Sequence, residues 1–97
     1  MKKIYLCGKI GDLPEEEYTS KFKKWKEQFE ENYIVVSPID LPHAHDKQWH
    51  SYMMEDLKAL IDCDIIAVMP CYIYSPGAQI EVAFARKMDK EIIYLTV

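Results

Sequence analysis

Two neighbouring segments decide the fold of this chain: residues 64–70, Asp-Ile-Ile-Ala-Val-Met-Pro, and residues 75–81, Ser-Pro-Gly-Ala-Gln-Ile-Glu. The first is an almost continuous apolar run, as expected of a strand that is buried on both faces. Ser75 is a suitable N-cap and Pro76 suits the first turn, so a helix is predicted to begin there. Helices that begin at the carboxyl end of a parallel strand are where α/β folds bind small, usually anionic, ligands. Glu81 is therefore expected to lie over a ligand crevice.

The rest of the chain repeats this order of strand and then helix. Further strands are predicted at 4–7, 33–36 and 91–97, and further helices at 14–29 and 47–61, while the helix that begins at Pro76 is predicted to end at residue 88. Strands that alternate with helices indicate a parallel sheet with right-handed crossovers. We therefore expect one α/β domain over residues 1–97, a flavodoxin- or Rossmann-like three-layer sandwich with a parallel sheet of about four strands.

The composition argues against several classes of protein. A net charge of −4 is unusual for a nucleic-acid binder, and the lysines of segment 14–29 are interpreted as a solvated helix face. No segment approaches the roughly 20 apolar residues of a membrane helix, so no membrane partner is expected. The N-terminus lacks the features of a signal peptide, and Cys7, Cys63 and Cys71 do not resemble a disulfide framework. A cytoplasmic protein with free thiols is expected.

Two carboxylates and one phenol are candidates for chemistry. Asp56 lies four residues after Tyr52 and four before Leu60, which places it within the apolar face of its helix. A carboxylate there is costly unless it is paired or faces a polar cavity; the alternative is a residue at the edge of the apolar stripe. Glu81 could instead be an acid that is present only because the helix dipole favours it near the N-terminus, and Tyr5 could be an ordinary core residue.

Three segments together resemble the nucleoside 2-deoxyribosyltransferase superfamily. They are residues 4–10, Ile-Tyr-Leu-Cys-Gly-Lys-Ile; residues 56–64, Asp-Leu-Lys-Ala-Leu-Ile-Asp-Cys-Asp; and Ser75-Pro-Gly77 with Glu81 four residues later. They follow one another in matching order over nearly the whole chain, and are similar to the 2'-deoxynucleoside 5'-phosphate N-hydrolases and to a short deoxyribosyltransferase-like branch. The resemblance implies cleavage or transfer at the N-glycosidic bond of a nucleoside or nucleoside 5'-monophosphate.

The resemblance also implies a role for each candidate. Glu81 would be the nucleophile, Asp56 would contact the substrate and assist the leaving group, and Tyr5 would orient Glu81. No cofactor is implied. Lys9 would favour a monophosphate modestly, because it is the fixed positive charge of the first loop. The expected substrate-binding residues are Gly8, Lys9, Ile10, His43, His45, Ser75 and Gly77.

The histidine loop has two interpretations. His43, His45 and Asp46 have the chemistry of a metal site. Alternating histidines in a proline-rich loop usually form local hydrogen bonds, however, so we expect no metal, and we place His43 and His45 beside the base pocket.

The sequence is compatible with two alternatives to an enzyme. A non-catalytic nucleotide-binding or sensing module on the same fold is the alternative to an enzyme, and a flavodoxin-like redox or signalling domain is a third possibility. Because so small a domain buries a modest fraction of its surface, a homodimer or higher homo-oligomer is expected.

Overall fold

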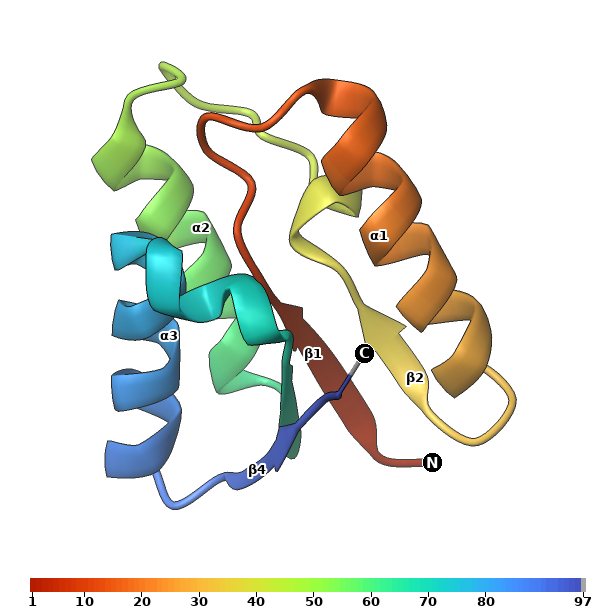
Figure 1. The fold of residues 1–97 in the computed structure, drawn as a ribbon. Coiled ribbons are helices and arrows are strands. Elements are labelled where there is room, and N and C mark those ends of the chain that lie inside the picture. Colours follow the sequence, from red (N-terminus) through yellow and green to blue (C-terminus); the bar gives the residue numbers. More distant parts are fainter. Residues whose placement is uncertain (97) are drawn as a thin grey trace.

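The structure of the protein is a computed structural model that describes residues 1–96. Within these residues four parallel strands form one sheet in the order β2-β1-β3-β4, with helices on both faces (Figure 1). The strands are β1 (Lys3–Cys7), β2 (Ile34–Val36), β3 (Ile65–Val68) and β4 (Glu91–Tyr94). The helices are α1 (Glu15–Phe29), α2 (Trp49–Ile61) and α3 (Pro76–Lys87), with two short 3₁₀ helices, η1 (Pro38–Asp40) and η2 (Pro70–Tyr74).

The predicted fold class and element order are confirmed, but the boundaries differ. The last strand ends at Tyr94, three residues before the predicted end, and Val97 lies outside the described residues. Segments predicted as open loops contain η1 and η2, each of which begins with a proline. Proline fixes φ near the helical value and lacks an N–H, so it suits the first position of such a turn. No helix within the described part of the chain is long and apolar enough to cross a membrane.

Alternation along β1 divides the core into two layers. Ile4 and Leu6 pack with Phe22 of α1 on one face of the sheet. Tyr5 and Cys7 point to the other face, where α2 and α3 pack side by side (Figure 1). Successive strand side chains point to opposite faces, so this register places Tyr5 on the same side as the two candidate carboxylates.

The sheet order creates a switch point between β1 and β3. From β1 the chain crosses to β2 on one side, and later returns to β3 on the other. The chain therefore continues from β1 to α1 on one face of the sheet and from β3 to α3 on the other. A crevice lies between the starts of these two helices. Such crevices are where open parallel sheets bind ligands.

Candidate active site

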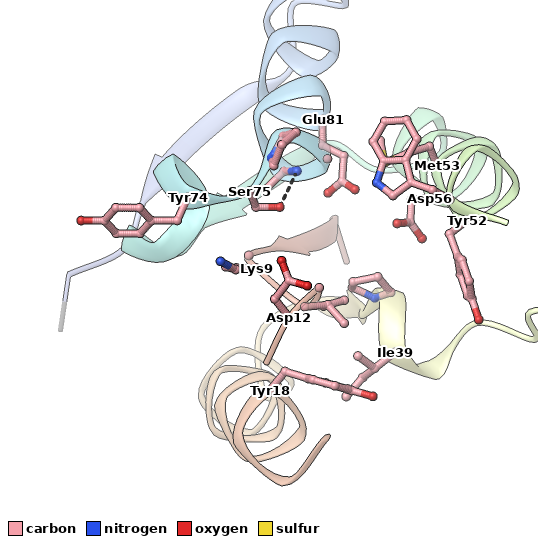
Figure 2. A pocket seen from close by; sticks show the side chains of 18 of the residues that line it. Lys9, Asp12, Tyr18, Ile39, Tyr52, Met53, Asp56, Tyr74, Ser75 and Glu81 are labelled. Atoms are coloured by element: carbon pink, nitrogen blue, oxygen red, sulfur yellow. Dashed lines mark hydrogen bonds between the residues drawn. The ribbon is translucent and has the colours of Figure 1, made fainter. Parts of the chain in front are cut away.

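A cavity of about 890 Å³ opens at this edge of the sheet, within the usual size range of small-molecule sites. Its walls come from the loop after β1, the start of α1, η1, the first half of α2 and the start of α3 (Figure 2). The loop after β1, η1 after β2 and the start of α3 after β3 all follow the carboxyl ends of strands. The topology therefore assembles the site from distant parts of the sequence.

The carboxyl groups of Glu81 and Asp56 both face this cavity (Figure 2). Glu81 is 5% exposed and Asp56 is 9% exposed. Burial, and secondly the neighbouring Asp56, raises the pKa of Glu81 well above its usual range. Burial likewise raises the pKa of Asp56 to about 7. Two adjacent buried carboxyls cannot both ionise cheaply, so the pair retains a proton near neutral pH.

Tyr5 lies in the core, adjacent to this pair. Burial, and then the charge of Glu81, raises the pKa of the Tyr5 phenol well above its ordinary value. The hydroxyl oxygen is buried and makes no hydrogen bond to any described residue. Leaving a buried hydroxyl unpaired costs about 1–3 kcal/mol, so this group is available to pair with Glu81 or with a ligand. Tyr5 does not itself belong to the described lining of the cavity.

The start of α3 forms as the sequence predicted. The Ser75 hydroxyl accepts a hydrogen bond from the Ala78 N–H at 3.2 Å, which makes Ser75 the N-cap. Gly77 follows, and a Cβ atom there would lie 3.0 Å from the sulfur of Met53. The absence of a side chain at Gly77 therefore allows the start of α3 to approach α2. This contact helps to place Ser75 and Glu81 at the cavity.

The first loop is fixed by contacts that the sequence did not reveal. Lys21 was interpreted as part of a solvated face, which is wrong: its Nζ donates to the carbonyl of Lys9 at 2.9 Å and to the sulfur of Cys71 at 3.1 Å. The Lys9 N–H also donates to Cys71, at 3.3 Å. At Gly8 a Cβ atom would lie 2.7 Å from the sulfur of Met69, so a larger residue would displace either the Met69 side chain or the loop. These contacts hold the loop across the end of β3.

Additional acidic side chains line the cavity and were missed by sequence reasoning. Asp12 and Glu15 come from the first loop and the start of α1, and Asp40 comes from η1. Asp40 forms an ion pair with Lys26 at 3.0 Å. The signal for Asp12 was its position after Gly11, in the loop at the carboxyl end of the first strand. The site is consequently more acidic than its motifs suggest.

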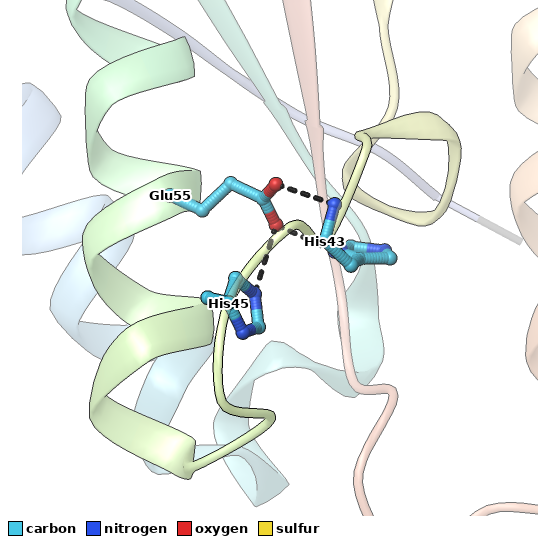
Figure 3. Close-up of side chains that lie close together, drawn as sticks. All are labelled: His43, His45 and Glu55. Atoms are coloured by element: carbon cyan, nitrogen blue, oxygen red, sulfur yellow. Dashed lines mark hydrogen bonds and ion pairs between the residues drawn. The ribbon is translucent and has the colours of Figure 1, made fainter.

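The two histidines are held by a glutamate that no motif indicated, Glu55 of α2 (Figure 3). One oxygen of Glu55 accepts the His43 backbone N–H at 2.7 Å, and the other lies 2.5 Å from His43 Nδ1. That second oxygen is also 3.4 Å from His45 Nε2. Asp46 belongs to a different contact, since it accepts hydrogen bonds from the Gln48 N–H and the Ser51 hydroxyl.

His43, His45 and Glu55 lie close enough together to hold a metal ion, with ligand atoms within 4.8 Å of one another. Their hydrogen bonds favour another role. The Lys47 N–H donates to His45 Nδ1 at 3.0 Å, so the proton of a neutral ring resides on Nε2, the nitrogen that faces Glu55. Nε2 then carries the proton and lacks the free electron pair of a metal ligand, although at 3.4 Å from the Glu55 oxygen it forms no hydrogen bond. The cluster fits a clamp that fastens this loop to α2.

Comparisons with known proteins place the chain in a family. The family model described as "Domain of unknown function (DUF4406)" matches residues 2–94. The chain belongs to the DUF4406 family. A search of curated proteins found no match.

The solved structures include one similar to this DUF4406 chain, a 2-desoxiribosyltransferase from Leishmania mexicana. The TM-score is 0.77 at 15% sequence identity, and the match covers 98% of this chain and 64% of that one. The DUF4406 chain therefore spans less than two thirds of the length of that protein. The likeness confirms the fold that the motifs implied.

The structure brings most of the predicted site residues of the DUF4406 chain to one cavity. Tyr5 is not among the described lining residues but lies behind Glu81, which is. His45 is also outside the described lining, and its ring packs against Tyr52 with ring centroids 4.5 Å apart. The predicted residues that line the cavity are Gly8, Lys9, Ile10, His43, Asp56, Ser75, Gly77 and Glu81.

Proposed function

We propose that this domain cleaves or transfers the N-glycosidic bond of a nucleoside or nucleoside 5'-monophosphate, with Glu81 as the nucleophile. The observation that carries the proposal is the pair of buried carboxyls, Glu81 and Asp56, that face one cavity of ligand size. Raised pKa values of two neighbouring acids in a cleft are typical of catalytic sites. The fold shared with a protein named as a 2-desoxiribosyltransferase supports the same reaction class.

The first step uses the single proton that the pair retains. The higher pKa of Glu81 places this proton on Glu81 at rest. In the reactive form the proton has moved to Asp56 and Glu81 is ionised. The Glu81 carboxylate attacks C1' of the sugar while the bond from C1' to the base nitrogen breaks, and Asp56 gives its proton to the departing base. The products are a free base and a glycosyl ester of Glu81. A pKa of about 7 suits Asp56 to donate and later accept a proton near neutral pH.

The second step releases the sugar. Water, or the nitrogen of a second base, attacks C1' and breaks the ester bond, while the Asp56 carboxylate takes the proton of the incoming nucleophile. Attack by water gives hydrolysis, and attack by a base gives transfer. The buried Tyr5 hydroxyl would donate a hydrogen bond to the Glu81 carboxylate and hold its direction through both steps.

Release of free base tests the proposal. The wild-type protein is incubated with deoxynucleosides, ribonucleosides and their 5'-monophosphates, and the base is measured by liquid chromatography. Glu81→Gln is isosteric but not nucleophilic, so release should fall to background. Glu91→Gln is the matched control, because Glu91 is exposed on β4 and outside the cavity lining, and it should leave the rate unchanged.

The outcomes separate the candidate functions. Wild-type turnover by Glu81→Gln would eliminate Glu81 as nucleophile. Tight binding of a nucleotide by the wild-type protein without release of base from any substrate would favour the non-catalytic binding module on the same fold.

A further inference from the structure

We infer that the substrate of this cavity carries a free 5'-hydroxyl rather than a 5'-phosphate, and that Asp12, which faces the capped start of α3 across the cavity, sets this preference. The inference rests on the proposed function, because it concerns the substrate class of the same site. Lys9 alone would favour a monophosphate, but the other charged residues that line the cavity favour the opposite preference.

The charges of the lining are predominantly negative. Lys9 is the one lysine or arginine among the described lining residues. Against it stand Asp12, Glu15 and the pair formed by Asp56 and Glu81. Asp40 also lines the cavity, but Lys26 offsets its charge. Asp12 and Glu15 are exposed and partly screened by water, whereas Asp56 and Glu81 are buried. The excess of negative charge therefore disfavours a second anion, most strongly at low salt.

The start of α3 offers an anion little compensation. Pro76 has no N–H, the Ala78 N–H is taken by the Ser75 hydroxyl, and the Gln79 N–H is taken by the Ser75 carbonyl. Of the four N–H groups that a helix start can present, only that of Gly77 remains without a partner among these contacts. The usual reason for phosphate binding at a helix N-terminus is therefore largely absent here.

The family resemblance implies that the 5' end of the substrate lies at Ser75 and Gly77, and Asp12 lines the cavity across from them. It follows Gly11 in the turn closed by the hydrogen bond from the Leu13 N–H to the Ile10 carbonyl, and has a left-handed φ of 67°. Figure 2 shows its carboxylate directed into the cavity, on the wall opposite Ser75. Lys21 fixes the start of the same loop by its bond to the Lys9 carbonyl.

A 5'-phosphate and a 5'-hydroxyl differ in charge and in their ability to donate a hydrogen bond to Asp12. A phosphate monoester carries about −1.5 to −2 charges at neutral pH and offers acceptors, so it repels a carboxylate. A hydroxyl is neutral and can donate a charge-assisted hydrogen bond to the same carboxylate. Asp12 thus disfavours a monophosphate and stabilises the bound nucleoside.

Equilibrium binding to the Glu81→Gln protein tests the inference without turnover. Calorimetry compares the four common deoxynucleosides with their 5'-monophosphates at low salt. The best-bound nucleoside should bind about tenfold or more tighter than its monophosphate, and the gap should shrink as salt screens the charges. Adding Asp12→Asn should strengthen monophosphate binding and weaken nucleoside binding, so that the gap narrows.

Asp89→Asn is the matched control. Asp89 has the same left-handed backbone, with a φ of 56°, and lies outside the described lining, so this change removes one charge without touching the cavity. It should leave the gap unchanged. Monophosphates that bind as tightly as nucleosides, or a gap that responds equally to both variants, would overturn the inference and leave the proposed reaction standing. Failure of every nucleoside and monophosphate to bind would overturn both.

Discussion

At the scale of single residues, Asp56 and Glu81 determine how the protein responds to pH. Their burial raises both pKa values, whereas in the unfolded chain each acid ionises near its ordinary value. As pH rises from about 4 to about 7, the unfolded chain loses the Asp56 proton and the folded protein keeps it. The folded state is then the one that binds more protons, so the free energy of unfolding falls over this window.

This sign gives a prediction for Asp56→Asn. Ionisation of Asp56 alone should cost the wild-type protein up to roughly 4 kcal/mol of stability between about pH 4 and 7, and the raised pKa of Glu81 adds to this loss. The variant has no proton to lose at position 56 and also removes the like-charged neighbour of Glu81, so its stability should be flatter with pH. Urea titrations at a series of pH values measure both curves, and parallel curves would show that Asp56 is not the buried acid described here.

At the scale of elements, the start of α3 links stability to the site. Replacing Ser75 by Ala removes the acceptor of the Ala78 N–H, which should lower the free energy of unfolding by about 1 kcal/mol. Ser75→Thr keeps a capping hydroxyl and should recover most of that loss. Chemical denaturation of the three proteins is the measurement; an equal loss in both variants would mean that the cap is not what stabilises the helix.

The elements also show what the sequence could and could not predict. The apolar run at 64–69 and the cap at Ser75 are local signals, so β3, α3 and the position of Glu81 follow from neighbouring residues. The bonds of Lys21 to Cys71 and of Glu55 to His43 join different elements and depend on packing. Helical periodicity places Lys21 on an outer face, yet the loop after β1 folds over it. Contacts between distant elements produce no spacing pattern in the sequence, so they could not be predicted from it.

At the scale of the whole molecule, apolar side chains remain on the surface of the two adjacent helices α2 and α3. Trp49, Met54 and Ile61 of α2 and Ile80 of α3 are all exposed. Exposed apolar side chains of this kind are common at protein interfaces, so the homodimer stays a prediction, and α2 is the helix to test first. Light scattering should give a mass at least twice that of the chain.

Met54→Lys places a charge on this surface, where Met54 is 62% exposed, and should shift the protein toward the monomer. Ile73→Lys is the control, because Ile73 is exposed on η2, outside both helices. A wild-type monomer at high micromolar concentration would contradict the prediction, as would equal effects of the two variants.

The central claim is that Glu81 forms a covalent bond to the sugar. The most direct measurement is mass spectrometry of the protein quenched during turnover of the best substrate from the base-release panel, followed by peptide mapping. We predict a mass increase equal to the glycosyl group on the peptide that contains Glu81, and its absence from Glu81→Gln. Base release with the adduct on another residue, or undiminished release from Glu81→Gln, would contradict the account.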